Sequence, residues 1–304
     1  MKSLVAGILF VAVFASLPVI TTRSDLLNLG VQIFLAVVLA QSWNLLGGYA
    51  GQINLGHAAF FGLGALVTRT LWVGGTPLIL ALFPGALVAM LFGLIIGVPA
   101  FRLRGAYFAI GTLGLAEILR ITIGNLMPQI STISALELAS YNILPRYYLT
   151  LGMAILCVVL VALLIPSRVG LGIRAVREDE AAAEATGVSA LRHKLLALAL
   201  STALSGLAGG AFAYYHVSYY PQHTFSPAWT FDAVLMSYIG GVGTVHGPVL
   251  GALFYVILRE LLAVKLVEFH LIIFGVLFIF VVLFLPGGLI EAWRRIRRMI
   301  ARST

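Results

Sequence analysis

The side chains of this sequence that could do chemistry are few, and they gather in one internal segment. Five of the nineteen basic residues and four of the eleven acidic residues lie within residues 166–194. The sequence contains no HExxH, GxSxG or GxxxxGK(S/T) pattern, and its apolar runs hold no paired carboxylates. We therefore expect no catalytic residue, no enzyme activity and no cofactor bound by this chain.

The centre of that segment, REDEAAAEATGV, predicts a short helix over residues 178–187. Acidic side chains suit the start of a helix, alanine and glutamate favour its interior, and glycine commonly ends it. Two helical turns are not stable alone in water, so something must hold them. The segment is either a solvated connector or a docking helix for a cytoplasmic motor subunit. For the docking interpretation, the candidate coupling residues are Arg177, Glu178, Ala182, Ala183, Glu184 and Gly187.

Two glycine-rich stretches carry further polar groups. GGYAGQINLGHAAFFGLG holds Asn54 and His57, and GGVGTVHGP holds Gly241, Gly243 and His246. Glycine lets helices approach closely or break, and polar groups at membrane depth face protein or a water-filled path. These residues either pack helices tightly or line a translocation path against a second subunit. No metal is expected at the histidines, because no cysteine, aspartate or second histidine lies at ligand spacing.

Charged residues inside the apolar runs are scarce. Glu117 and Arg120 lie three residues apart, which predicts a pair on one helix face, and Arg259 and Glu260 lie near the end of another run. Ionisable groups deep in the membrane would mark an ion or proton relay, and none stands out. This scarcity disfavours an ion-coupled secondary transporter, which stays as an alternative. A membrane-embedded enzyme is disfavoured more strongly, since the catalytic patterns are missing.

Membrane-spanning helices must position these residues. The 304-residue chain is 61% hydrophobic and 10% charged, whereas soluble domains carry about 25% charged residues. Continuous apolar runs of bilayer-crossing length recur, which excludes an alternating outer-membrane barrel. The single cysteine, Cys157, is expected to pack inside one run. We predict an all-α polytopic membrane protein with about ten transmembrane helices, at 3–20, 26–46, 51–72, 78–101, 106–123, 147–165, 195–217, 231–245, 247–264 and 269–285.

The distribution of basic residues predicts how these spans are oriented in the membrane. Ten crossings put both termini on one side with thirteen of the nineteen basic residues, and the positive-inside rule makes that side cytoplasmic. We expect the span at 3–20 to be retained rather than cleaved as a signal peptide. The C-terminal RRIRR is expected to bind lipid headgroups, and nothing in the sequence suggests nucleic-acid binding. The aromatic loop 217–232 falls outside, with Tyr219, Tyr220 and Trp229 as interface anchors.

Several segments resemble one family of transport proteins. Ala182, Ala183 and Gly187 fit the EAA-then-glycine spacing in the coupling segment of ABC-importer permeases, although Ala181 stands where that pattern has glutamate. Four longer blocks are similar, in the same order, to LivM-type permeases of branched-chain amino acid importers. They are QSWNLLGGYAGQINLGHAAFFGLGAL, RLRGAYFAIGTLGLAEILR, AAAEATGVSALRHKLLALALSTALSGLAGGAFAYY and SYIGGVGTVHGPVLGALFY. The resemblance covers roughly residues 26–290.

This resemblance implies one transmembrane permease domain over residues 1–304, with a cytoplasmic coupling loop at 166–194, in a bacterial inner membrane. It implies three kinds of partner: a second permease of the LivH type, two cytoplasmic ATPase subunits that hold ATP and magnesium, and a periplasmic amino-acid-binding protein. The implied substrate is a branched-chain amino acid. Permeases for urea and short-chain amides belong to the same superfamily and remain the alternative.

Overall fold

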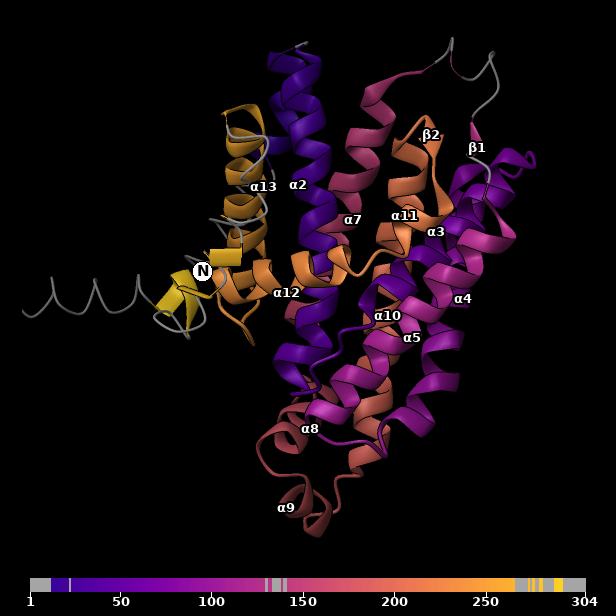
Figure 1. The fold of residues 1–304 in the computed structure, drawn as a ribbon. Coiled ribbons are helices and arrows are strands. Elements are labelled where there is room, and N and C mark those ends of the chain that lie inside the picture. Colours follow the sequence, from indigo (N-terminus) through magenta and orange to yellow (C-terminus); the bar gives the residue numbers. More distant parts are fainter. Residues whose placement is uncertain are drawn as a thin grey trace, which may run out of the picture.

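The computed structural model is a bundle of long helices that run side by side (Figure 1). It describes residues 12–21, 23–128, 131–132, 138, 141–265, 273, 275–276, 279–280 and 287–291. The helices within these residues include α2 (Ser24–Trp43), the π-helical η1 (Asn44–Tyr49), α3 (His57–Val73), α4 (Leu78–Ala100), α5 (Ala106–Leu126), α7 (Ile143–Leu164), α8 (Arg168–Glu178), α9 (Glu180–Ala185), α10 (Ala190–Tyr215), α11 (Pro221–Thr224), α12 (Ala228–Gly240) and α13 (Gly247–Lys265). Two short strands, β1 (Ser131–Thr132) and β2 (Ser218–Tyr219), pair antiparallel.

Five helical segments of the described residues are long and apolar enough to cross a membrane. They are α2 with η1, α4, α5, α7 and α10. These segments coincide with five predicted spans, so the prediction of an all-α membrane protein is confirmed. The predicted span at 3–20 is helical where it is described, from residue 12, and the one at 269–285 lies mostly outside the described residues.

Two predicted spans differ from the observed helices in where they begin and in their length. Residues 51–56 are not helical, so the span predicted at 51–72 begins only at His57. Gly51 has φ +69°, a left-handed conformation that side chains disfavour, and it turns the chain there. The span predicted at 231–245 is the 13-residue helix α12, which ends where Gly241 adopts φ +125°. Figure 1 shows α12 lying across the bundle, whereas α13 runs along α2.

Glycines bring α3, α4 and α10 into close contact. A Cβ atom added to Gly64 of α3 would clash with the backbone of Gly206 on α10, and one on Gly209 would clash with the carbonyl oxygen of Phe61. Helices in lipid associate through such small residues, because apolar side chains gain little by leaving the equally apolar lipid. The contact fixes the short helix α3 against the longer α10.

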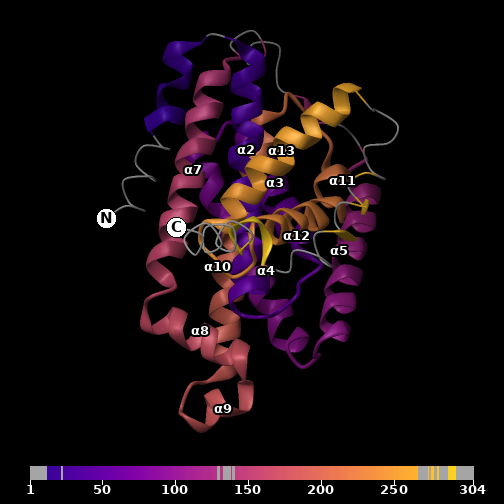
Figure 2. The same ribbon diagram turned by 90° about the vertical axis from the view of Figure 1, so that its left-hand side faces the viewer.

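A second group of helices packs through large side chains. Figure 2 shows α7, α2 and α13 next to one another. Phe34 of α2 meets Tyr147 of α7 edge to face, with ring centroids 5.3 Å apart. Trp43 and Cys157 belong to the same core and are fully buried, so the expectation that Cys157 packs inside a span is confirmed. This core runs along α2 from Leu27 to Trp43.

Arginines from two neighbouring helices hold the end of α10. The buried Arg69 of α3 donates to the carbonyl oxygens of Ala213, His216 and Val217 at 3.0, 3.0 and 2.8 Å. Arg146 of α7 donates to the carbonyl oxygen of Tyr214 at 3.1 Å. The last carbonyls of a helix lack partners within the helix and carry partial negative charge, which cations stabilise. Both arginines therefore have a structural role.

Candidate functional site

The charged segment 166–194 forms two short helices rather than one. Helices α8 and α9 project from one end of the bundle in both side views (Figures 1 and 2). The helix predicted over 178–187 is present as the shorter α9: Glu178 ends α8, and Asp179 is extended, with φ −155° and ψ 114°. The Asp179 carboxylate accepts a hydrogen bond from the Ala182 N–H at 3.0 Å and so caps α9. An aspartate that bonds locally to backbone favours such a cap over a helix interior.

The predicted coupling residues divide between two faces of α9. Ala183 is buried against Val176 and Ala190, whereas Ala182 and Glu184 are exposed. Gly187, also exposed, has φ +88°, which confirms the predicted left-handed helix end. The exposed face therefore carries mostly methyl groups, which allow another surface to approach closely.

An ion pair ties α9 back to the bundle. The Lys194 Nζ of α10 lies 2.7 Å from the Glu180 Oε2 of α9, and the lysine side chain is only 6% exposed. A largely buried lysine needs such a partner, because its charge is costly to remove from water. The pair makes α9 part of the same body as the first turns of α10.

Arg177 connects α8 to both glycine-rich stretches. Its Nη1 donates to the carbonyl oxygen of Gly48, at the end of η1, at 2.6 Å. A Cβ atom on Gly243 would lie 2.8 Å from the same nitrogen, and one on Gly51 would lie 3.0 Å from the arginine Cγ. Glycine at these positions therefore lets the arginine reach the backbone. Arg177, predicted as a coupling residue, therefore contacts the two glycine-rich stretches, which were predicted separately to pack helices or to line a path.

The second glycine-rich stretch is bonded to the residues directly before the first one. The Asn44 Oδ1 accepts from the Gly243 N–H at 2.7 Å, and its Nδ2 donates to the Thr244 carbonyl oxygen at 3.0 Å. Gln41 donates to the Val245 carbonyl oxygen at 2.9 Å. The turn after α12 is therefore clamped to the end of α2 by buried amides. His246, at the end of this turn, is exposed.

Asn54 and His57 lie where the chain breaks between η1 and α3. Both side chains are buried, at 1% and 0% exposure. The Asn54 Oδ1 accepts from the Gly56 N–H at 2.6 Å, and its carbonyl oxygen accepts from the Trp43 indole at 2.8 Å. The His57 Nε2 lies 2.8 Å from the Ser42 hydroxyl, and its Nδ1 has no partner among the described residues. The Asn54 side chain and the Trp43 indole thus satisfy non-helical backbone groups inside the protein.

The start of α3 contacts the start of α12. The Thr230 hydroxyl of α12 accepts from the Ala58 N–H in the first turn of α3, at 2.8 Å. Such an N–H has no partner within its own helix, so the hydroxyl replaces the missing acceptor. Interrupted helices that meet inside a bundle are typical of transporter binding sites.

A cavity of about 390 Å³ opens beside this meeting point, and sequence reasoning missed it. Its charged lining residues are Asp232 and Arg259. The aromatic stretch 217–232 was expected to be an outer loop, but it contains β2, α11 and the start of α12. Pro227, directly before the apolar run AWTFDAVLMSYIG, is the signal that could have placed Asp232 on a helix.

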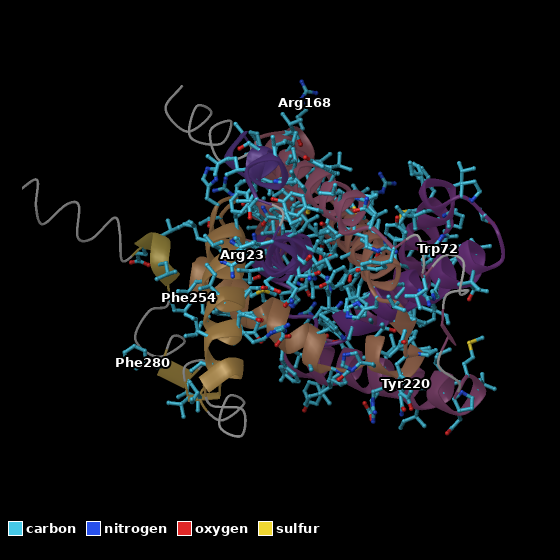
Figure 3. The ribbon with its side chains drawn as sticks, turned by 90° about the horizontal axis from the view of Figure 1, so that it is seen from above. Arg23, Trp72, Arg168, Tyr220, Phe254 and Phe280 are labelled. Carbon is cyan, nitrogen blue, oxygen red and sulfur yellow. The ribbon has the colours of Figure 1, made fainter. Side chains whose placement is uncertain are left out.

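Tyr219 also departs from its predicted role. It is 1% exposed rather than at the interface, and burial raises the pKa of its hydroxyl above the ordinary value. Tyr220 is 46% exposed and lies at the edge of the bundle (Figure 3). The predicted pair of Glu117 and Arg120 is confirmed, with the arginine Nε donating to the carboxylate at 2.8 Å. Within the described ranges, no three metal-ligating side chains converge.

Comparisons with known proteins agree with this geometry. The family described as branched-chain amino acid transport system / permease component matches residues 25–282. The chain is 28% identical over 291 residues to the high-affinity branched-chain amino acid transport system permease protein LivM of Escherichia coli (strain K12), covering 85% of this chain and 68% of the relative. It is 27% identical over 308 residues to the probable branched-chain amino acid transport permease protein LivM of Methanocaldococcus jannaschii, covering 83% of this chain and 89% of the relative.

No solved structure matches the chain significantly. The family match nevertheless extends from the start of α2 past the end of α13, and so includes the breaks, the clamp and the projecting helices. The chain belongs to the family of permease components of branched-chain amino acid transport systems.

Proposed function

We propose that this chain is a transmembrane permease subunit of an ATP-driven importer for branched-chain amino acids in a bacterial inner membrane. The names of the similar proteins and the family match support the transport role. In this proposal the single domain of residues 1–304 crosses the membrane many times, although α12, with 13 residues, is too short to be one of the ten predicted crossings. Both termini and the coupling loop 166–194 face the cytoplasm, and basic residues concentrated on that side support the orientation.

The importer needs further subunits. A second permease of the LivH type would pair with this chain, and two cytoplasmic ATPases would bind ATP and magnesium. A periplasmic amino-acid-binding protein would deliver the substrate. The exposed, alanine-rich face of α9 is the surface that we assign to ATPase contact, because it projects beyond the bundle and leaves room for a close partner.

The hydrogen bond from Arg177 to Gly48 is the observation that carries the coupling role. Movement of α9 by an ATPase would be transmitted to α8 and, through Arg177, to the end of η1. The amide clamp of Asn44 would then move the turn after α12 with it. Packed elements of this kind transmit motion as rigid pieces between discrete arrangements. Because both interrupted helices connect to this point, they would shift together.

A bulky charge on the exposed face of α9 tests the docking surface. We expect Ala182→Arg to abolish co-purification with the ATPases while the permease still assembles with its second permease subunit, because the arginine would separate the two surfaces. Ala183→Arg is a poorer probe, since Ala183 is buried within the segment itself. The matched control is Asn125→Arg, at an exposed position near the far end of α5. Undiminished ATPase association of Ala182→Arg would rule out α9 as the docking element.

The substrate is tested by reconstituting the assembly with the binding protein in liposomes. We expect ATP-dependent uptake of tritiated leucine that unlabelled isoleucine and valine inhibit and that urea and acetamide do not. Inhibition by the amides alone would assign the chain to amide transport instead.

A further inference from the structure

The cavity beside α12 lies among helices that the proposed mechanism would move. Side chains from α2, α3, α10, α11, α12 and α13 line it, and its volume of about 390 Å³ falls in the range of small-molecule sites. Trp229 and Phe61 stack in its wall with ring centroids 4.7 Å apart. The cavity is thus built from both interrupted helices and their neighbours.

One acidic and one basic side chain face the cavity from adjacent helices. The Asp232 Oδ2 of α12 and the Arg259 Nη1 of α13 are 3.9 Å apart, beyond hydrogen-bond distance. Tyr255 donates to the Asp232 Oδ1 at 2.6 Å, and Arg259 donates to the Gln32 side-chain oxygen at 3.2 Å. The neighbouring hydrogen bonds orient both charges. Their separation leaves each able to bond a third group.

Apolar side chains line much of the remaining cavity wall, beside the imidazoles of His216 and His223. Leu35 and Leu39 of α2, Phe212 of α10, and Met236 of α12 line it. Such a surface favours a hydrocarbon side chain, since apolar groups gain about 25 cal/mol per Å² removed from water. The cavity therefore joins a pair of opposite charges to an aliphatic and aromatic surface.

We propose that this cavity is a binding site for a zwitterionic aliphatic amino acid inside the permease, an inference that rests on the proposed transport function. The Arg259 guanidinium binds the ligand carboxylate, and the Asp232 carboxylate binds the ligand ammonium group. The aliphatic side chain of the ligand lies against Leu35 and Met236. The opposite charges of the site match a net-neutral zwitterion. A cation or anion would leave one of them unmatched, and an uncharged amide would match neither.

The test measures equilibrium binding of tritiated leucine to the assembly of both permeases and the ATPases without the periplasmic binding protein. Wild type is expected to bind leucine saturably, and Arg259→Gln and Asp232→Asn are expected to weaken binding at least tenfold. Glu117→Gln and Arg120→Gln are matched controls, because their ion pair has similar exposure and lies outside the cavity. Both controls should bind leucine like the wild type.

Competition separates ligand recognition from a structural ion pair. Leucinamide lacks the carboxylate, so it should compete poorly with leucine in the wild type but as well as leucine does in Arg259→Gln. If the charge variants do not assemble, Leu35→Trp keeps both charges and fills the apolar wall, and it should abolish binding. Absence of saturable binding in the wild type would overturn the proposed site. Wild-type affinity in both charge variants would also overturn it. If those variants do not assemble, wild-type affinity in Leu35→Trp has the same meaning.

Uptake assays distinguish failure of this site from failure of the transport function. ATP-dependent leucine uptake that persists unchanged in Arg259→Gln and Asp232→Asn would remove the site but leave the proposed function intact. No leucine uptake by the complete wild-type assembly would remove the proposed function itself.

Discussion

At the scale of single residues, Arg177 links two parts of the chain that lie 129 positions apart. It does so by donating to a backbone carbonyl, so its contact depends on the space left by Gly51 and Gly243. A guanidinium offers several donors in a rigid plane, which no other side chain reproduces at this site. The contact gives the projecting segment a direct connection to the interior of the bundle.

Replacing this arginine should uncouple ATP hydrolysis from transport. We expect Arg177→Gln to reduce ATP-dependent leucine uptake about tenfold while the ATPases still bind and hydrolyse ATP, because the connection and not the docking surface is lost. The ratio of ATP hydrolysed to leucine accumulated in proteoliposomes measures this. Arg168→Gln is the control on the same helix, since Arg168 points away from the bundle (Figure 3). An unchanged ratio in Arg177→Gln would show that force passes by another route.

At the scale of elements, the breaks before α3 and after α12 decide where polar groups lie. The sequence predicted the long helices well, because an uninterrupted apolar run of bilayer length has few other solutions. It missed the break before α3, because the polar residues 51–56 were joined to the apolar run that follows them, whereas the backbone changes direction at Gly51. Gln52 and Asn54 beside that glycine were the available signal for non-helical backbone.

Only part of the candidate site could be predicted, because some of its features depend on local conformation and others on tertiary packing. The end of α9 at Gly187 was predictable because it depends on local conformation. The burial of Ala183 was not, since it depends on packing against Val176 and Ala190. Asp232 fell at the boundary between the predicted loop 217–232 and the predicted span 231–245, whereas α12 starts at Ala228. Its partner Arg259 is distant in sequence, and spacing alone cannot pair them.

The close packing of α3 on α10 gives a test at this scale. Gly64→Ala should lower stability by about 2–3 kcal/mol, because the new methyl group would collide with backbone atoms of Gly206 rather than with a movable side chain. Gly114→Ala is the matched control within α5, where an added Cβ meets nothing within 4 Å. It should be neutral or stabilise by up to about 1 kcal/mol. Thermal midpoints of the two purified variants give the comparison, and equal midpoints would contradict the packing argument.

At the scale of the whole molecule, the structure separates two regions. Helices α8 and α9 lie at one end of the bundle, and the cavity beside α12 lies within it. The connecting parts are the end of η1 and the turn that Asn44 and Gln41 clamp. In the proposed mechanism, a force applied at the projecting end would reach the interior through this bonded backbone. This arrangement suits a subunit that is moved by its partners.

A liposome experiment tests that dependence. The chain reconstituted alone should accumulate no leucine under any ion gradient, whereas the complete assembly with ATP should concentrate it. Internal tritiated leucine, measured with and without an imposed proton or sodium gradient, gives the result. Concentrative uptake by the single chain would instead establish the ion-coupled secondary transporter.

The burial of Cys157 has a practical consequence for mapping this protein in its membrane. It is the only thiol in the sequence and is 0% exposed, so bulky maleimides should not label it in the folded chain. The natural chain can therefore serve as the unlabelled control in cysteine-labelling experiments. A cysteine introduced at Ala182 or Asn125 would be the sole reactive group, and an impermeant reagent applied to sealed vesicles of known sidedness would report which compartment each position faces.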